Sequence, residues 1–378
     1  MPGHYKLYLD TFCEVYDLLS PYADGEFWDL TDYVFQPNSV YVIGRHQFHS
    51  HSKQIFNAMT HTDSRVVFSN PAEGSSTMLG QIWMMPRFND APGSRHENLK
   101  ILAGGDMNSD FDYLMYENFL PKILDYDENI RESARINEIY EKTEKPYKFL
   151  FLNGRIRSHR KYLIDRFLVS GLINESLWTM LDSSSAGSKR LWHIHEGRDT
   201  LLDPLPHKFL DPYYEVDKYS KRPTDQTYAK YELFNEEWGE IYLKAEPYID
   251  TYFSLVTETV FDYPYSFRTE KIWKPIVMGH PWIAVSNAGY YRDLRNLGYK
   301  TYDHLIDESF DLIHNGQSRI ERIATVVEDL CKQDLSAFLR EAESISKYNI
   351  ERHKEHRLEV RKEFPKRFFK FIEEWYYD

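Results

Sequence analysis

The chain alternates short apolar segments with helix-forming segments, and this alternation constrains its fold more than any other feature. The apolar, β-favouring runs end at small or polar residues, and they lie at 40–43, 65–69, 100–103, 149–152 and 282–286. Helix-favouring stretches follow several of them, as at 51–59 and 156–170. Such alternation is typical of layered α/β folds with parallel sheets. The sequence therefore predicts an α/β fold of the doubly wound, Rossmann-like kind.

The length of 378 residues indicates about two domains, at roughly 150 residues each. The polar, helix-favouring segment 127–144 is typical of a helix that connects two domains, and Pro146 breaks this helix. We expect a first domain over 1–144 and a second over 145–335. Residues 336–378 form a long amphipathic helix with an aromatic end that needs burial and a salt-bridged solvent face. We expect this helix to pack back across the domain junction.

The net charge of −13 is concentrated in the first part of the chain. Residues 1–144 carry 11 Lys or Arg against 22 Asp or Glu, whereas the remainder is nearly balanced. An acidic surface repels polyanions, so a nucleic-acid partner is disfavoured for the first domain. The simplest alternative is that the charge serves only solubility.

Several classes of protein are excluded by composition. Aromatic residues make up 16% and charged residues 28% of the chain, which argues against disorder. No apolar run approaches the roughly 20 residues that a membrane span needs, and the N-terminus lacks a signal-peptide pattern. Cys13 and Cys331 form no disulfide or metal framework. We expect a cytoplasmic setting.

The strongest candidate motif lies between residues 253 and 285. Glu258 and Glu270 flank a loop rich in Tyr and Phe, and Lys271 follows directly before a predicted helix. A helix N-terminus binds phosphate through its free N–H groups, and Lys271 adds a positive charge for a diphosphate. The two carboxylates can accept hydrogen bonds from ribose hydroxyls. The alternative is that Glu270 and Lys271 are only the charged start of an amphipathic helix.

A second candidate motif is the strand-to-helix turn at 153–160. Asn153 ends the strand, and the cationic side chains that follow are Arg155, Arg157, His159 and Arg160. This arrangement suits a diphosphate leaving group, because backbone N–H groups and positive charges converge there. The alternative is a set of surface arginines at the start of a helix.

Both motifs resemble those of the α-1,3-fucosyltransferases. The matching elements are Val256–Thr259, Phe267–Trp273 and Met278–Ile283, and Arg155 matches a phosphate-binding arginine of that family. The region 147–315 also resembles a group of phage and bacterial glycosyltransferase-like proteins. The resemblance implies two facing Rossmann-like domains of the GT-B type and a GDP-sugar donor. It further implies inversion, no essential metal beyond stimulation by Mg²⁺ or Mn²⁺, and donor contacts from Phe267 and Thr269.

A transferase of this kind also needs a base for the acceptor hydroxyl. Glu73 lies in the loop 70–76 after the predicted strand 65–69, where such a base is expected. Asp106, after the run 100–103, is an alternative base. A helix-capping role is an equally good interpretation of Glu73.

Metal ligation has weaker signals. The candidate groups are His46, His49 and His51, then His193, His195 and Glu196, and the Asp-x-Asp pairs at 110–112 and 125–127. None provides a full ligand set at a known spacing, so no metal site is predicted.

The sequence thus predicts a glycosyltransferase that moves a sugar from a nucleotide-diphosphate sugar to a hydroxyl of a glycan or other acceptor. Glu73 would take the proton, while Arg155 and Lys271 would neutralise the departing diphosphate. One alternative is a transferase acting on hydroxymethylated bases of phage DNA. Another is a non-catalytic nucleotide- or glycan-binding module.

Overall fold

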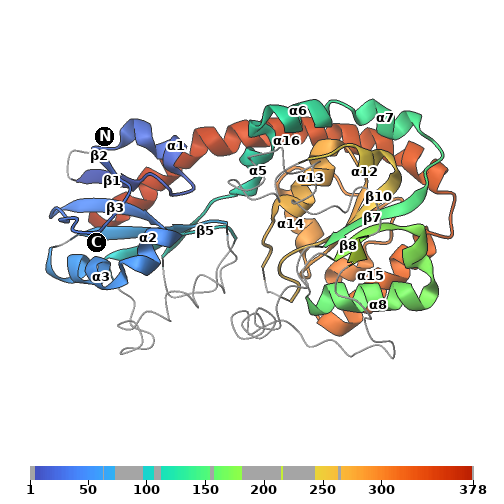
Figure 1. Ribbon diagram of the computed structural model, residues 1–378, viewed down its shortest axis with the longest axis horizontal. Helices are drawn as coiled ribbons and strands as arrows, with labels where there is room; N and C mark the ends of the chain where they lie inside the picture. Colours follow the sequence, from blue (N-terminus) through green and yellow to red (C-terminus); the bar gives the residue numbers. More distant parts are fainter. Residues whose placement is uncertain are drawn as a thin grey trace. The chain divides into compact units, whose positions relative to one another are not determined.

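The computed structural model describes residues 5–62, 64–72, 97–105, 112–153, 157–180, 214–215, 243–262 and 265–376. The chain forms two compact units (Figure 1). The first unit comprises residues 1–118 and 357–378, and the second comprises 119–356. Each unit is built on its own sheet, so the predicted α/β class is confirmed.

The first unit contains a six-stranded parallel sheet in the order β2-β1-β3-β4-β5-β6. Its strands are β1 (Lys6–Asp10), β2 (Gly25–Phe27), β3 (Ser39–Gly44), β4 (Arg65–Asn70), β5 (Leu99–Ala103) and β6 (Tyr113–Met115). The chain steps from β1 to β2 on one side and then returns to β3 on the other. The strand order therefore reverses between β1 and β3, and folds of this class bind ligands at the carboxyl ends of the strands beside such a reversal.

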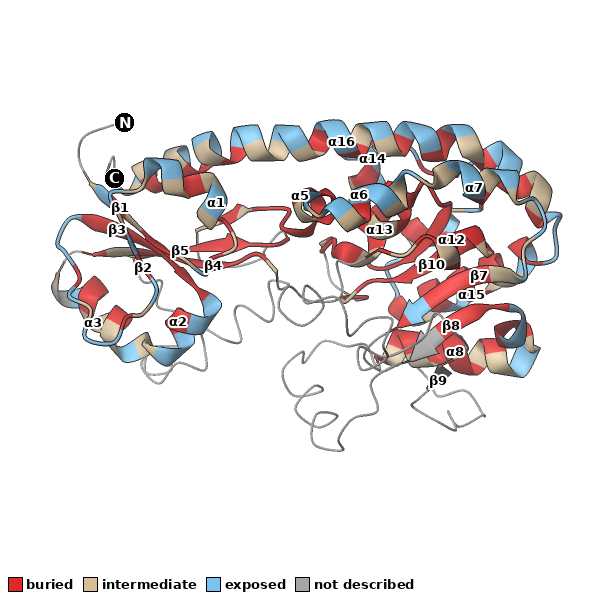
Figure 2. Cartoon of the chain, turned by 45° about the horizontal axis from the view of Figure 1, so that its top comes forward, coloured by how far each residue is buried: buried red, intermediate tan, exposed pale blue. Residues whose placement is uncertain are grey.

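Both faces of this sheet are covered, which explains its nearly unbroken apolar strands. Tyr41 and Ile43 face one core, which α2 (Arg45–Ser50) and α3 (Ser52–His61) cover. Val40 and Val42 face the other core, because successive side chains of a strand point to opposite faces. The second core is completed by α1 (Tyr16–Leu19) and by the end of α16 (Leu335–Glu373). Figure 2 shows these strands as buried.

The C-terminal end of α16 is an integral part of the first unit. Its apolar side chains Phe364, Phe368, Phe371 and Ile372 are buried in the second core, as the sequence predicts for the aromatic end. Lys100 of β5 is 3% exposed, and its Nζ donates to the carbonyl of Phe371 at 2.6 Å. Trp375 Nε1 donates to the carbonyl of Glu97 at 2.7 Å. The last turns of the chain are thus fixed to strand β5 by polar as well as apolar contacts.

The second unit contains a five-stranded sheet in the order β11-β10-β7-β8-β9. Its strands are β7 (Tyr147–Asn153), β8 (Leu177–Met180), β9 (Tyr214–Glu215), β10 (Thr251–Thr257) and β11 (Trp282–Val285). All neighbours pair in parallel except β8 and β9, which are antiparallel. The chain goes from β7 to β8 on one side and later places β10 on the other. The strand order of this sheet therefore reverses between β7 and β10.

The helices that the structure describes in the second unit precede, separate and follow these strands along the chain. They are α5 (Phe119–Lys122), α6 (Asp127–Ser133), α7 (Ile136–Glu141), α8 (Ser158–Ser170), α12 (Glu246–Ile249), α13 (Glu270–Met278), α14 (Tyr290–Asn296) and α15 (Gly316–Leu330). Residues 335–356 of α16 also belong to this unit. The predicted solvent face of α16 is confirmed in part by ion pairs such as Lys354–Glu351 and Lys366–Glu363.

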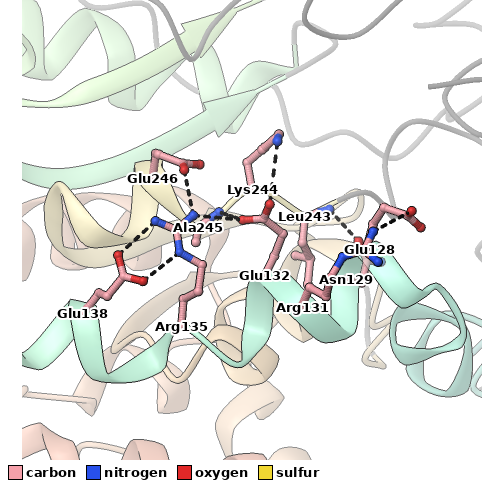
Figure 3. Close-up of polar contacts among 10 residues, drawn as sticks. All are labelled: Glu128, Asn129, Arg131, Glu132, Arg135, Glu138, Leu243, Lys244, Ala245 and Glu246. Carbon is pink, nitrogen blue, oxygen red and sulfur yellow. Dashed lines mark hydrogen bonds and ion pairs between the residues drawn. The ribbon is translucent and has the colours of Figure 1, made fainter. Parts of the chain in front are cut away.

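The contacts divide the chain after residue 118 rather than at the expected boundary of 144. Helix α6 and Arg135, the residue before α7, are hydrogen-bonded to the segment 243–246 of the second unit (Figure 3). Asn129 Oδ1 accepts from Leu243 N at 2.9 Å, and Arg135 Nη1 donates to Glu246 Oε1 at 2.7 Å. The segment 127–144, which was expected to connect the two domains, therefore belongs to the second unit.

The structure also describes the two cysteines and the lengths and polarity of the helices. Cys13 and Cys331 are both buried free thiols. No helix in the described part of the chain is long and apolar enough to cross a lipid bilayer.

Candidate functional site

The two sequence motifs meet at the point where the strand order of the second sheet reverses. Asn153 is the last residue of β7, and Thr257 is the last residue of β10. Thr257 Oγ1 donates a hydrogen bond of 2.7 Å to Asn153 Oδ1, and both residues are buried. The ends of the two strands are therefore joined at the position where α/β sheets of this kind bind ligands.

Helix α8 is fixed to the end of β10 through its first turn. The carbonyl of Glu258 can only accept, so His159 Nε2 donates to it, at 3.1 Å. Arg160 Nη2 donates to the carbonyls of Thr257 and Glu258, at 3.1 and 3.3 Å. Burial, together with Arg160 and Arg157, lowers the pKa of His159 well below its usual value, so its imidazole is neutral. Arg160 is 2% exposed, and its guanidinium orients the strand end.

Glu258 fixes the start of helix α13. Its Oε2 accepts from Thr269 Oγ1 at 2.6 Å, and its Oε1 accepts from Thr269 N at 3.2 Å. Tyr290 OH also donates to Oε1, at 2.8 Å. Burial raises the pKa of this carboxyl, against the opposing charge of Lys271 and the hydrogen bond from Thr269. Both oxygens are thus engaged by protein donors, and a ribose contact at Glu258 would have to displace one of them.

Lys271 and Glu270 form the first turn of α13. Lys271 Nζ contacts Glu270 Oε1, lies 3.1 Å from Thr269 Oγ1, and has a quarter of its side chain exposed. Burial acts to raise the pKa of Glu270, but Lys271 and Lys274 outweigh it, so this pKa lies below its usual range. A cation at the positive end of a helix dipole is suited to bind an anion.

The structure brings most of the predicted donor residues to this edge of the sheet. They are Asn153, Arg157, Arg160, Glu258, Thr269, Glu270 and Lys271. Phe267 is 2% exposed and belongs to the core. Arg155 lies outside the described residues, as do Glu73 and Asp106. Tyr290 was not predicted, because nothing in its local sequence links it to Glu258.

The first unit also has a polar constellation where its strand order reverses. Asp10 ends β1, and its carboxylate accepts from Phe12 N and Gly44 N, each at 3.0 Å. A side chain at Gly44 would lie 3.0 Å from Asp10 Oδ2 and 3.3 Å from Cys13 Cα, so the loop after β1 passes close over the end of β3. Ser69 Oγ, at the end of β4, donates to Glu14 at 2.9 Å. The sequence did not single out Asp10 or Glu14.

Among the residues that the structure describes, the histidines of the first unit form no group that could hold a metal ion. His51 Nε2 lies 3.5 Å from Asp29 Oδ1. Over the residues that the structure describes, no group of three or more His, Cys, Asp or Glu side chains is placed to hold a metal ion. His193, His195 and Glu196 lie outside them.

Comparisons with known proteins find no relative of this chain. No protein-family model matches it, and no curated protein and no solved structure is significantly similar to it. The fucosyltransferase resemblance therefore stands on the motifs alone.

Proposed function

We propose that this protein is a glycosyltransferase, and that its second unit binds a nucleotide-diphosphate sugar at the reversal between β7 and β10. The observation that carries the proposal is the convergence of two motifs, 153–160 and 258–271, that are about a hundred residues apart in sequence. Both open helices, α8 and α13, whose first turns lie at the carboxyl ends of the reversing strands. This is the usual place for a nucleotide in an open α/β sheet.

The roles of the residues follow from their contacts. Lys271 is part-exposed at the N-terminus of α13, so it supplies positive charge to the diphosphate, together with Arg155. Glu258, Arg160 and Thr257 hold the strand and helix ends in place. By resemblance the donor is a GDP-sugar and no metal is essential.

The reaction that we propose is a direct displacement with inversion. The acceptor oxygen attacks the anomeric carbon, the bond from that carbon to the diphosphate oxygen breaks, and the acceptor proton passes to the carboxylate of Glu73. The diphosphate leaves with its negative charge offset by Arg155 and Lys271. The acceptor hydroxyl belongs to a glycan or other neutral molecule and is held by the first unit in a GT-B-like arrangement.

Calorimetric titration with GDP tests the donor site. Lys271→Ala is expected to weaken nucleotide binding at least about tenfold, which corresponds to about 1.4 kcal/mol. Lys332→Ala is the matched control, because Lys332 is 73% exposed and pairs with the surface residue Asp329 on a helix of the same unit. Equal affinity of Lys271→Ala and wild-type protein for GDP and UDP would remove Lys271 from the site and sink the proposal.

Turnover separates an enzyme from a binding module. Slow hydrolysis of GDP-fucose, GDP-mannose or UDP-glucose in the absence of acceptor is expected of an active transferase. Nucleotide binding with no release of sugar from any donor would favour the non-catalytic module.

A further inference from the structure

Two large aromatic side chains are exposed at the carboxyl edge of the first sheet. Phe12 and Trp28 are each 71% exposed, although most aromatic side chains of the described chain are buried. Phe12 follows β1 and Trp28 follows β2, and these strands are paired neighbours with Asp10 opposite Phe27. Thr11 N continues the pairing by donating to the carbonyl of Phe27 at 2.9 Å. The two aromatic residues therefore emerge from adjacent strand ends.

The backbone that carries both residues is held rigidly. Phe12 N donates to Asp10 Oδ1, while Gln47 Nε2 of α2 donates to the carbonyl of Trp28 at 2.6 Å. Asp29, the residue after Trp28, accepts from Thr31 N and Thr31 Oγ1, both at 2.9 Å. Exposed rings on a fixed backbone bind a planar or flat ligand face with little loss of conformational entropy.

Polar side chains suited to hydroxyls lie next to Trp28 along the chain and in contact with one another. Hydrogen bonds from Thr31 lower the pKa of Asp29, so its carboxylate is an ionised acceptor beside Trp28. His51 lies 3.5 Å from the same carboxylate and is one-fifth exposed. Aromatic faces accompanied by a few fixed polar groups recognise ligands that have both an apolar face and hydroxyls at the rim.

Charge decides which ligand of this kind fits. Aromatic pairs also stack on nucleobases, but proteins that bind single strands combine them with a positive groove. Residues 5–62 contain seven Asp or Glu against three Lys or Arg. A polyanion is therefore disfavoured, and a neutral carbohydrate meets both the aromatic faces and the acceptor groups.

We propose that Phe12 and Trp28 form a platform on which a pyranose ring of a neutral glycan stacks, at the carboxyl edge of strands β1 and β2. The acceptor role of this platform rests on the proposed function, whereas carbohydrate binding itself does not. Asp29 accepts hydrogen bonds from the hydroxyls of the stacked sugar.

Fluorine NMR of the full chain labelled with 5-fluorotryptophan tests the platform. The protein has eight Trp residues, and Trp28→Phe identifies the Trp28 resonance. The probes are the methyl glycosides of galactose, glucose, mannose and N-acetylglucosamine, up to about 50 mM because single-sugar affinities are in the millimolar range. We expect at least one of them to shift the Trp28 resonance saturably.

The variants should then fall in a defined order. For that sugar, measured by saturation-transfer NMR, Trp28→Ala and Phe12→Ala are expected to weaken binding at least about fivefold, with Trp28→Phe between wild type and Trp28→Ala. Val34→Ala is the matched control, because Val34 is 73% exposed in the same unit, and it should bind normally. Both aromatic side chains lie outside the core, so all variants should melt as wild type does.

The outcomes separate the platform from the donor site. If no sugar moves the Trp28 resonance, or if oligothymidylate moves it instead, the platform is wrong even when GDP binds. If a sugar binds through Trp28 but GDP does not bind, the proposed transferase is wrong and the platform stands. GDP affinity should be the same in Trp28→Ala and wild-type protein.

Discussion

Each of the two sheets reverses its strand order, and different side chains lie at the two reversals. In the second unit, the reversal between β7 and β10 is a dense polar network in which Asn153, Thr257 and Glu258 tie strand ends to helix starts. In the first unit, the carboxylate of Asp10 accepts hydrogen bonds from Phe12 N and Gly44 N at the corresponding reversal, and exposed aromatic rings lie on the same edge. We propose a charged ligand at the edge of the second sheet and a neutral ligand at the edge of the first. The parallel sheets place both reversals at the carboxyl ends of strands, whereas the residues at those strand ends differ in their chemistry.

The units also differ in how their cores are completed. The second unit is formed by one continuous stretch of chain, whereas the first needs residues 357–378 from the far end of the sequence. The largest expected effect therefore comes from the end of α16.

Phe368→Ala should unfold the first unit preferentially. Phe368 is fully buried against the strands of the first sheet, and truncation of such a side chain costs about 3–5 kcal/mol. Hydrogen exchange should show lost protection in β1 and β3, with β7 and β10 unchanged. Leu358→Ala, at a position 65% exposed on the same helix, is the control and should leave exchange as in wild type. Equal loss of protection in both sheets would contradict the division into two units.

Much of the fold is predictable because several elements carry local signals. The apolar runs at 40–43 and 65–69 correspond to β3 and β4, and the spacing at 156–170 corresponds to α8, which Gly171 ends with a φ of +77°. Strand β1 was missed, because Lys6, Tyr8 and Asp10 interrupt its apolar pattern. This segment forms a strand because it pairs on both sides, with β2 and with β3, which lie further along the chain.

The sequence indicated several residues of the candidate site but not the contacts among them. The turn after the apolar run at 149–152 indicated Asn153, and the start of a predicted helix after a loop rich in Tyr and Phe indicated Lys271. The sequence could not show that Tyr290 would donate a hydrogen bond to Glu258, or that the guanidinium of Arg160 would donate to backbone carbonyls. These contacts depend on the packing of α8 and α14 onto β10, which no local pattern specifies. The division after residue 118 was missed for the same reason.

Acid should destabilise the second unit before the first. His280 is completely buried, and burial lowers its pKa to about 3, against 6.5 in the unfolded chain. Between these values the unfolded state binds more protons, so stability falls as pH falls from about 6.5 towards 3. At pH 4.5 this group alone costs about 2–3 kcal/mol relative to neutral pH. His159, also buried and neutral, acts in the same direction.

Urea unfolding at pH 7 and pH 4.5 measures this difference. His280→Gln lowers stability at pH 7, since Ser254 and Thr251 lose their partner, but its stability should change less with pH than that of wild type. His304→Gln, at a position 56% exposed, is the control and should keep the wild-type slope. His46, His49 and His51 of the first unit are not fully buried, so its strands should keep their exchange protection at pH 4.5. An unchanged slope in His280→Gln would show that other groups govern acid lability.

The smallest effect tests whether the polar network at β7 and β10 is structural only or also positions a ligand. Thr257→Val keeps the shape of the side chain but removes the hydroxyl that donates to Asn153 Oδ1, which costs about 1–2 kcal/mol at a buried pair. Thr325→Val serves as the control and should cost less, because the half-buried Thr325 hydroxyl donates to the carbonyl of Glu321 and its contact with Arg166 Nη2 is long, at 3.3 Å. If the reversal is the donor site, Thr257→Val should also weaken GDP binding several-fold, whereas Thr325→Val should leave it unchanged. The reason is that Thr257 ends β10, and the backbone carbonyls at this strand end hold the first turn of α8. Equal GDP affinity in both variants, with the stability loss confined to Thr257→Val, would make the network a structural counterpart of Asp10 and remove the functional contrast between the two edges.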